Sequence, residues 1–404
     1  MPRFAFLAAA SLAALAACSE PAPVQEPVLD TPPPSPQTLA EAGLGPAPDT
    51  AVEALAPFYA QLDYDPPIAA PGPPLPGDDA ALTSIAFGSC NTAEREIPIL
   101  NTIAAEDHDL FMYIGDNVYG DVYSYDAAMP ELRAAYHQLA ERPEFQTLRA
   151  RFPMLATWDD HDYGMNDAGG RFAFKGFAET LFLDFWRAEA DDVRRTRPGV
   201  HDAKIFGPEG QRVQVILLDT RYFRSDLTRT PDRGAPGRER YIPSEDPDQT
   251  LLGAEQWAWL EDQLRKPADV RLLVSSIQVH ADGHGWEAWR TMPLERQRLY
   301  DLIGETGANG VVIVSGDRHS SGLYVREDVA PYPLYEITSS SLNMSFRDEN
   351  NEPGPHRIGD MYAPVNYGVV GFDWPSGELA LQIKDEAGAV VREQRVSLSE
   401  ITGG

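Results

Sequence analysis

Short apolar runs recur along most of this sequence, and they constrain its fold more than any other feature. They begin with "LTSIAF" at residue 82 and continue through "DLFMYI", "FPMLAT", "VQVILL", "VRLLVS", "GVVIVS", "YPLYEIT", "GVVGFDW" and "LALQIK". Their residues are apolar and often β-branched, with no polar alternation in most of them. Such continuous runs are typical of strands that are buried on both faces.

Segments with helical spacing separate many of these runs. They cover roughly residues 129–149, 172–187, 254–265 and 294–304. Alternating strands and helices, followed by a strand-rich end, predict a layered domain of the α/β or α+β class. The segment 225–248 is rich in Pro, Arg, Asp and Gly, and we predict that it forms a long surface loop.

The composition limits the choice of partners. Of the 404 residues, 43% are hydrophobic and 10% are aromatic, which is enough for a substantial core. The chain has 62 Asp and Glu against 33 Lys and Arg, a formal charge of -29. This balance argues against nucleic acid or an anionic membrane surface as the main partner, because both need a basic face. An anionic substrate would also be repelled unless bound cations reversed the local charge.

The first residues resemble a bacterial lipoprotein signal. Arg3 precedes the apolar run "FAFLAAASLAALAA", which is too short to span a bilayer as a stable helix. The run ends in "LAAC", which resembles the lipobox at which a signal peptide is cut before a lipidated cysteine. We therefore expect a signal peptide at 1–17 and a lipid anchor at Cys18, with an ordinary cleaved signal as the alternative. By the same resemblance, Ser19 in place of Asp implies the outer membrane of a bacterial cell envelope, with the protein facing the periplasm.

The region that follows is unlike a folded domain. Residues 19–80 carry 16 of the 35 prolines, and few large apolar side chains accompany them. We predict a Pro-rich acidic tether over 18–80. The stretch "TAVEALAPFYAQLDY" within it is expected to form one short helix that packs on the main domain, which covers 81–404.

Polar clusters come directly after four of the apolar runs. They are Cys90 in "IAFGSCN", Asp116, Asn117 and Tyr119 in "MYIGDNVYGD", Asp159 to Asp162 in "LATWDDHDYGMND", and Asp317, Arg318 and His319 in "VIVSGDRHSSG". Ligand sites of layered α/β folds lie beyond the carboxyl ends of the strands. Carboxylates, histidines, a phenol and a thiol that meet at such an edge predict a polynuclear metal site.

The order and spacing of these clusters resemble the calcineurin-like metallophosphoesterases, and more narrowly the PhoD-like alkaline phosphatases. The resemblance is carried by Gly88-Ser89-Cys90, Gly115-Asp116-Asn117-Val118-Tyr119, Trp158-Asp159-Asp160-His161-Asp162 and Gly316-Asp317-Arg318-His319. It extends over about residues 82–345, including "LLDTRYFRSD" and "WEAWRTMPLERQRLYDLI". It implies a four-layer α/β/β/α sandwich whose metal site lies at the C-terminal ends of the strands. The chain departs from this family in two ways. The segment "WEAWRTMP", which begins at Trp286, lacks the Asp-Gly-Tyr that often follows this tryptophan in the family. A Pro-rich tether also takes the place of the β-sandwich that precedes the domain in some relatives.

The resemblance also implies a ligand set. Asp116 would bridge two ions, and Cys90, Tyr119 and His319 would complete the first site. Thiolate, phenolate and imidazole ligands suit iron, as Fe3+, better than magnesium or calcium. Asp160 and Asp317 would complete the second site with Asp116, and these all-oxygen ligands favour Ca2+. Two Zn2+ or Mn2+ ions are the alternative.

The implied activity is hydrolysis of phosphate esters by metal-bound hydroxide, without a phosphoenzyme. His161 would protonate the leaving group, and Asn117 and Arg318 would contact the phosphoryl oxygens. His280 lies near the position of a superfamily histidine ligand and is a further candidate. The substrate would be a small phosphate ester or a phospholipid. A phospholipase C-type phosphodiesterase and a non-catalytic calcium-binding surface lipoprotein are the alternatives.

Each residue also has an ordinary explanation when it is taken alone. Cys90 could be a small buried apolar residue, and Tyr119 a core aromatic. Asp160 and Asp162 could cap a helix, and His319 could be a hydrogen-bonded core histidine. These explanations require four separate coincidences at strand ends, so we favour the metal site.

Overall fold

The computed structural model describes residues 51–346 and 352–402, and its strands form two sheets. The predicted signal peptide and Cys18 lie outside the described residues. The first sheet has the strand order β13-β12-β11-β1-β2-β3. Its strands are β1 Ser84–Gly88, β2 Leu110–Ile114, β3 Met154–Thr157, β11 Asn366–Asp373, β12 Glu378–Asp385 and β13 Val390–Ser397.

The second sheet has the strand order β10-β8-β9-β7-β6-β5-β4. Its strands are β4 Asp202–Phe206, β5 Val213–Leu217, β6 Val270–Ser275, β7 Val311–Ser315, β8 Ser321–Arg326, β9 Leu334–Thr338 and β10 Arg357–Tyr362. β1, β2 and β3 run parallel in the first sheet, and β5, β6, β7 and β9 run parallel in the second. The carboxyl ends of the parallel strands of each sheet therefore lie at a common edge.

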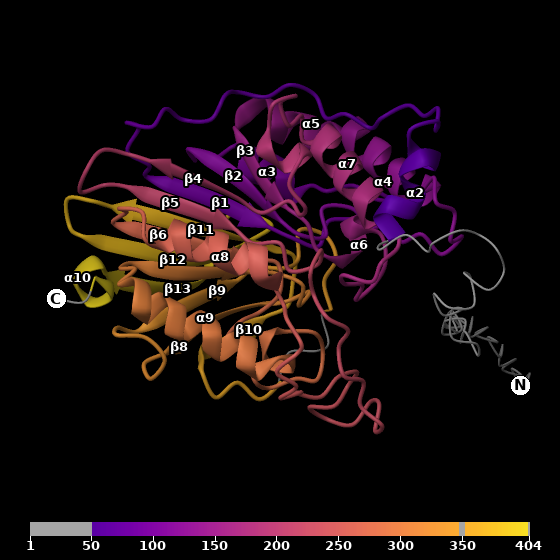
Figure 1. Cartoon of the computed structure of the whole chain (residues 1–404). Helices are drawn as coiled ribbons and strands as arrows, with labels where there is room; N and C mark the ends of the chain where they lie inside the picture. The colour runs from indigo at the N-terminus through magenta and orange to yellow at the C-terminus, as the bar shows by residue number, and fades with distance from the viewer. Residues whose placement is uncertain (1–50, 347–351, 403–404) are drawn as a thin grey trace, which may run out of the picture. The chain divides into compact units, whose positions relative to one another are not determined.

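Helices cover the outer faces of the two sheets (Figure 1). The first sheet is covered by α3 Ile99–Ala104, α4 Pro130–Glu141, α5 Pro143–Arg151 and α7 Lys175–Phe185. The second is covered by α8 Gly253–Leu264 and α9 Pro293–Thr306. This arrangement confirms the predicted four-layer α/β/β/α fold. The shorter helices are α2 Ala51–Tyr59, α6 Asp160–Tyr163 and α10 Leu398–Ile401, with 3-10 turns at Val193–Arg195 and Trp289–Thr291.

Strand β2 shows why its sequence is a continuous apolar run. Leu110, Met112 and Ile114 belong to the core between the sheets, whereas Phe111 and Tyr113 belong to the core beneath the helices. All five side chains are fully buried. A strand with a layer on each side buries both of its faces, so alternation in polarity disappears.

One predicted helix is interrupted. The segment 129–149 is divided between α4 and α5, because Arg142 takes an extended conformation with φ -66° and ψ 122°. Proline disfavours the helical conformation in the residue before it, and Pro143 imposes this break.

Four strands have no counterpart among the predicted runs, namely β4, β8, β10 and β13. Of these, β4, β10 and β13 are edge strands. Edge strands bury less of their surface and therefore carry polar residues, as "VVREQRVS" in β13 shows.

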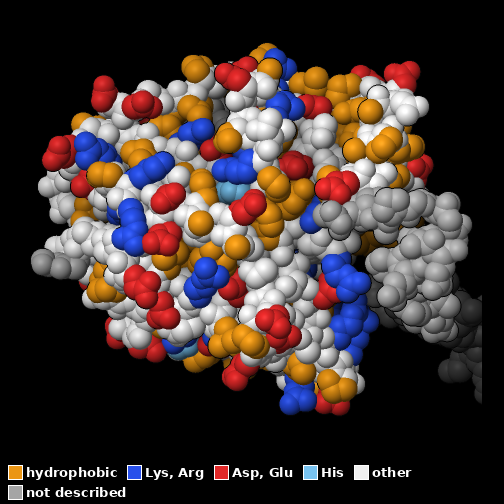
Figure 2. All heavy atoms as spheres, in the orientation of Figure 1, with side chains coloured by type: hydrophobic (Ala, Val, Ile, Leu, Met, Phe, Trp, Pro, Cys, Tyr) orange, Lys and Arg blue, Asp and Glu red, His pale blue; other side chains and the backbone are white. Residues whose placement is uncertain are grey.

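The remaining regions follow the expectations for short elements and loops. Helix α2 occurs where a short helix was expected, and Tyr59 stacks on Phe177 of α7 with ring centroids 4.6 Å apart. The segment 225–248 is a loop that contains only isolated bridges. Within 51–346 and 352–402, no helix has the length and apolarity needed to cross a membrane. On the face drawn in Figure 2, acidic side chains are interspersed with basic ones.

Candidate metal centre

The structure brings the polar clusters of the sequence together at the ends of the strands. Cys90 follows β1, Asp116 follows β2, Asp160 follows β3 and Asp317 follows β7. Three groups of potential metal ligands share Asp116, and within each group the ligand atoms lie within 4.8 Å of one another. The groups are Cys90, Asp116 and His319; Asp116, Asp160 and His161; and Asp116, Asp159, Asp160 and Asp317.

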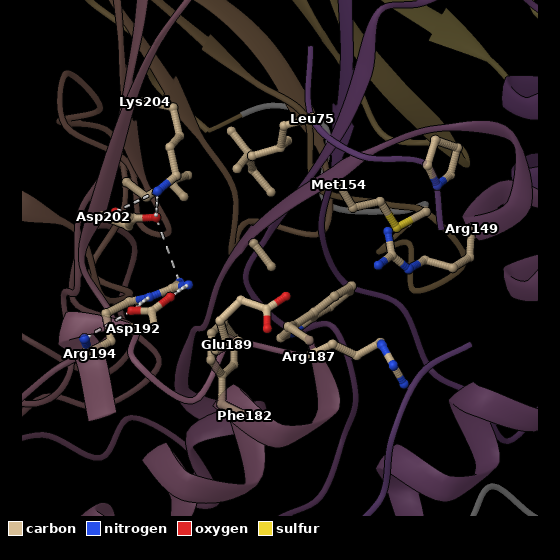
Figure 3. Close-up of a pocket in the computed structure, with 16 residues that line it drawn as sticks. Leu75, Arg149, Met154, Phe182, Arg187, Glu189, Asp192, Arg194, Asp202 and Lys204 are labelled. Atoms are coloured by element: carbon tan, nitrogen blue, oxygen red, sulfur yellow. Dashed lines mark hydrogen bonds and ion pairs between the residues drawn. The ribbon is translucent and has the colours of Figure 1, made fainter. Parts of the chain in front are cut away.

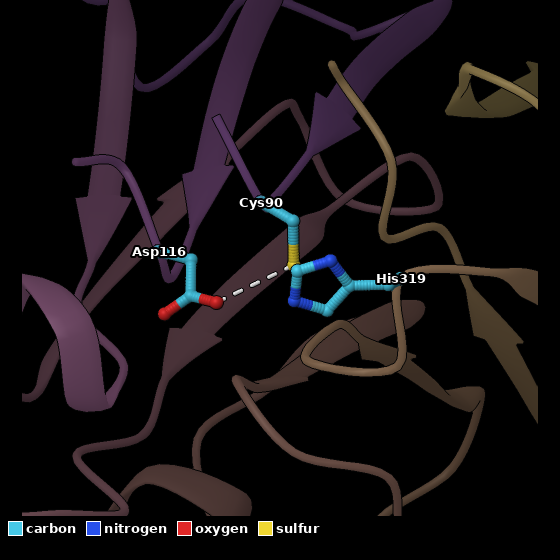
Figure 4. A group of neighbouring side chains, drawn as sticks. All are labelled: Cys90, Asp116 and His319. Atoms are coloured by element: carbon cyan, nitrogen blue, oxygen red, sulfur yellow. Dashed lines mark hydrogen bonds between the residues drawn. The ribbon is translucent and has the colours of Figure 1, made fainter. Parts of the chain in front are cut away.

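The first group offers sulfur, oxygen and nitrogen (Figure 4). Cys90 Sγ lies 3.4 Å from Asp116 Oδ2. The Tyr119 hydroxyl lies 3.2 Å from Asp116 Oδ2 and 3.2 Å from His319 Nε2. Four groups with lone pairs therefore converge, and together they offer the S, N and O ligands that a transition-metal cation accepts.

His319 is held in the tautomer that a metal ligand requires. Its Nδ1 lies 2.8 Å from the carbonyl oxygen of Met344, which can only accept a hydrogen bond, so Nδ1 carries the proton. Nε2 then presents its lone pair towards Tyr119 and Cys90. The ring stacks on Phe346 at 4.1 Å between centroids, which fixes its plane.

Ser340 connects two of the first-group residues. Its Oγ accepts a hydrogen bond from the His319 backbone N–H at 2.8 Å and lies 3.1 Å from Cys90 Sγ. The Ser340 hydroxyl proton is therefore available to Cys90 sulfur. Burial raises the pKa of the Cys90 thiol to about 12, and the Ser340 hydrogen bond opposes this rise. A thiolate at this position needs a cation beside it.

The third group, Asp116, Asp159, Asp160 and Asp317, contains only carboxylates, and they repel one another. Burial raises the pKa of Asp116 and of Asp317 well above the ordinary value, and neighbouring negative groups raise both further. Burial also raises the pKa of Asp159 to about 6, although Arg221 opposes the rise. Asp116 Oδ1 and Asp159 Oδ2 are buried without a hydrogen-bond partner. Buried carboxylate oxygens without hydrogen-bond partners, in a group whose ligand atoms lie within 4.8 Å of one another, fit a hard cation such as calcium.

Four of the predicted ligands lie on strained backbone. Cys90, Asp116, Asp317 and His319 have φ of 57°, 49°, 63° and 51°. Non-glycine residues rarely adopt this left-handed region, and such strain is concentrated at functional sites. Gly115 has a φ of 115°, and a Cβ there would lie 2.6 Å from Asp159 Cβ, so both the backbone conformation and the available space require glycine.

Asp162 positions the loop that carries Asp116. Its carboxylate accepts hydrogen bonds from the backbone N–H groups of Asp116, Asn117 and Asp159, at 3.2, 3.2 and 2.6 Å. It also forms a capping box with Asp159 at the start of α6. The capping explanation is therefore correct for Asp162, which joins the ends of β2 and β3 and lies outside the ligand groups.

His161 lies beside the centre and is anchored on one side. Its Nδ1 lies 2.6 Å from Asp121 Oδ2, and its ring lies 4.3 Å from that of Tyr119. Burial lowers the pKa of His161, but Asp160, Asp116 and Asp121 outweigh this effect and raise the pKa well above the ordinary value. The side chain is 16% exposed, so a proton can be exchanged with a ligand or with water.

Asn117 and Arg318 have fewer N–H donors available for a phosphoryl oxygen than their predicted roles assume. The Asn117 amide nitrogen donates to Thr157 O at 2.9 Å and to Asp162 Oδ2 at 2.5 Å, so no N–H remains for a phosphoryl oxygen. Arg318 donates to Glu352 at 2.6 Å, and its buried Nε has no partner among the described residues.

His280 lies outside the centre. Its Nδ1 lies 2.9 Å from the Tyr300 hydroxyl and its Nε2 lies 3.0 Å from the Leu334 carbonyl. Both ring nitrogens are therefore occupied, and His280 belongs to none of the ligand groups of the described residues. It is a buried histidine with satisfied hydrogen bonds.

The predicted ligand set left out four contributors, namely Asp159, Asp121, Arg221 and Ser276. Asp159 joins the carboxylate group and is held by an ion pair with Arg221 and by Ser276, which donates to Asp159 Oδ1 at 2.6 Å. Asp121 anchors His161. Asp121 could have been found from the sequence, because it ends the polar stretch "MYIGDNVYGD". Arg221 and Ser276 could not, because they are distant from Asp159 in the sequence and form no local pattern with it.

Comparisons with known proteins identify relatives. The family model described as PhoD-like phosphatase matches residues 194–367, which include the fourth cluster but not the first three. Alkaline phosphatase D of Bacillus subtilis (strain 168) is 26% identical over 282 residues. The match covers 61% of this chain and 48% of that relative, so the chain spans about half of the relative's length.

Solved structures share the fold. A structure of PhoD matches with a TM-score of 0.61 and 18% identity over 83% of this chain and 74% of that chain. A purple acid phosphatase from yellow lupin (Lupinus luteus) seeds matches with a TM-score of 0.51 and 14% identity over 80% of this chain and 55% of that chain. The family model and the curated relative both show that this chain is similar to PhoD-like phosphatases, and the solved structures share its fold.

Proposed function

We propose that this protein hydrolyses phosphate esters at a centre of two metal cations. The observation that carries the proposal is the position of Asp116, whose carboxylate is shared by the sulfur–nitrogen–oxygen group and by the all-carboxylate group. A shared carboxylate brings two cations close enough to act on one phosphoryl group. The similarity to PhoD-like phosphatases supports the same reaction class.

The chemistry divides between the cations and the side chains. Bound cations would neutralise the phosphoryl oxygens and lower the pKa of a coordinated water. His161, anchored by Asp121, would donate a proton to the leaving alkoxide. Asp162 would fix the position of Asp116 relative to Asp159, because it accepts hydrogen bonds from both backbone N–H groups. Arg318 would contact the phosphate only through the N–H donors that are not bound to Glu352.

The two donor sets suggest different metals. We expect Fe3+ on Cys90, Asp116, Tyr119 and His319, and Ca2+ on the carboxylate group, because soft and strongly donating ligands favour iron and hard oxygens favour calcium. A calcium chelator should abolish turnover reversibly while iron stays bound. A ferric phenolate or thiolate should also colour the protein.

Elemental analysis and visible absorption test this assignment. Tyr119→Phe should shift or bleach the band, whereas Tyr125→Phe, at an exposed tyrosine, should leave it unchanged. A colourless, fully active protein that contains zinc or manganese and no iron would contradict the assignment of Cys90 and Tyr119 as iron ligands.

Two model substrates separate the candidate reactions. We expect turnover of p-nitrophenyl phosphate or of bis(p-nitrophenyl) phosphate, and a preference for the bis ester would favour a phosphodiesterase of the phospholipase C type. Turnover of neither substrate by metal-loaded protein would favour a calcium-binding lipoprotein without catalysis.

We also propose that Cys18 carries a lipid anchor that holds the protein at the periplasmic face of the outer membrane. The proposal rests on the sequence "LAAC". Cys18→Ser should release the protein from the membrane fraction and leave its specific activity unchanged, because the anchor and the domain are separated by a Pro-rich segment. Membrane association of the Cys18→Ser protein would indicate another attachment.

A further inference from the structure

A second cavity lies away from the metal centre, where the edge strands β3 and β4 of the two sheets face helices α5 and α7 (Figure 3). Its volume is about 280 Å³, and none of its lining residues belongs to the candidate metal-ligand groups of the described residues. The apolar part of its wall consists of Leu75, Met154, Leu155, Phe182, Trp186 and Leu217.

One side of the cavity is electrically balanced. Arg194 pairs with Asp192 at 2.6 Å, and Lys204 pairs with Asp202 at 3.1 Å. Figure 3 shows these four side chains together, joined by dashed lines. Each charge in these two pairs has a partner, so the pairs form part of the cavity wall without adding net charge to it.

Arg149 on the other side is not balanced. It lies in the last turn of α5 and is 9% exposed, so most of the residue is withdrawn from water. Its Nε donates to the carbonyl of Ala70 at 3.2 Å, but no carboxylate or other acceptor among the described residues contacts its two terminal nitrogens. A buried charge without a counter-ion is strongly unfavourable, and charged residues in this position are almost always paired.

Neighbouring residues are arranged around this guanidinium. Gly72 leaves space for it, because a Cβ at that position would collide with the Arg149 side chain and carbonyl. Burial lowers the pKa of Arg149, and the nearby positive charge of Arg187 lowers it further. Arg187 therefore adds to the excess of positive charge around Arg149.

Arg187 also lines the cavity and lacks a counter-ion among the described residues. It follows the end of α7 and has a φ of 60°, a strained conformation for a residue other than glycine. Figure 3 shows Arg149 and Arg187 on the side opposite the ion pairs. Glu189 also lines the cavity and offers one negative charge against these two positive ones.

We propose that this cavity binds a small oxyanion, a phosphate group that is either free or carried by a small organic molecule, between Arg149 and Arg187. Guanidinium groups bind phosphate oxygens with paired N–H donors. A volume of about 280 Å³ is at the lower limit of small-molecule pockets, so it suits a small ligand better than a nucleotide or a macromolecular partner. The aromatic and aliphatic wall offers a surface for the organic part of a ligand. This inference does not rest on the proposed catalytic function.

Thermal unfolding of the full chain with inorganic phosphate tests the proposal. Phosphate at about 100 times its Kd should raise the ratio of folded to unfolded protein about 100-fold in the wild type. Arg149→Met should lose most of this gain. The matched control is Arg151→Gln, because Arg151 lies in the same turn of α5 but is exposed and paired with Asp107. Without phosphate, Arg149→Met should be at least as stable as the wild type, since it removes an unbalanced buried charge.

Phenylphosphonate distinguishes the two sources of the phosphate group, because its P–C bond resists hydrolysis and its ring reaches the apolar wall. Tighter binding than phosphate, lost in Arg149→Met, would identify an organic ligand, whereas equal binding would identify the free anion. Phosphate at the metal centre would stabilise all variants alike, and that outcome, or no stabilisation of the wild type, would overturn the proposal. If Arg149→Met does not fold, the same measurement is made on Arg187→Gln, at the exposed rim of the cavity, which should lose most of the stabilisation by phosphate. Its retention of the full phosphate effect would also overturn the proposal.

Discussion

Asp116→Asn is expected to abolish phosphoester hydrolysis and to release the cation that the carboxylate group holds. Asp116 belongs to both the sulfur–nitrogen–oxygen group and the all-carboxylate group, so its loss would remove an oxygen ligand from both proposed cations. Changes to residues that only support a metal ligand cost about 10–100-fold in metal affinity or activity. A shared ligand should therefore cost more than about 100-fold in kcat/KM. Steady-state kinetics and elemental analysis of the same preparation measure both effects.

The control for Asp116→Asn is Asp107→Asn, at the opposite end of strand β2. Asp107 precedes β2, its side chain is fully exposed, and it pairs only with the exposed Arg151. Asp107→Asn should leave metal content and turnover unchanged. If Asp116→Asn kept both metals and most of the turnover, the bridging role would be wrong even if the protein were a phosphatase.

His161→Ala should keep the metals and lose turnover in proportion to the difficulty of the leaving group. General acid catalysis contributes about 10²–10⁴-fold, and this loss should appear with alkyl phosphates. A p-nitrophenyl ester, whose leaving group needs little protonation, should lose much less. The measurement is kcat/KM across a series of leaving groups, for which His161→Ala should give a steeper dependence on leaving-group pKa than the wild type.

Asp121 provides an internal check on that result. Because Asp121 anchors His161 Nδ1 at 2.6 Å, Asp121→Asn should weaken the same step, and the double variant should be little worse than His161→Ala alone. His137→Ala is the matched control, since His137 is a partly exposed helix residue that contacts only the Asp65 carbonyl. Equal losses on alkyl and p-nitrophenyl esters would remove the general-acid role.

The fold was largely predictable because burial on both faces leaves a mark in the sequence. Phe111 and Tyr113 face the helices while Leu110 and Met112 face the second sheet, so β2 reads as a continuous apolar run. The edge strands β4, β10 and β13 lack that continuous apolar run, and they were not predicted. The break at Arg142 was visible in the sequence as the residue before a proline.

The site was predictable as far as strand ends determine it. Parallel strands end at a common edge, so Cys90, Asp116 and Asp317 were expected to meet, and they do. The partners that hold these residues come from distant segments. Ser340 lies 250 positions after Cys90, and Arg221 lies 62 positions after Asp159, so no local spacing connects them. The left-handed backbone at Cys90 likewise has no local signal, because cysteine rarely adopts a positive φ.

A metal titration that follows bound metal and turnover together tests the central claim most directly. Protein freed of metal by chelation is loaded stepwise with iron and then with calcium, and bound metal and hydrolysis of p-nitrophenyl phosphate and its bis ester are measured at each step. The account predicts that turnover appears only when a second cation joins the first, at two bound cations for each chain, and that Asp116→Asn never reaches that state. Full turnover in protein that contains no metal would contradict it.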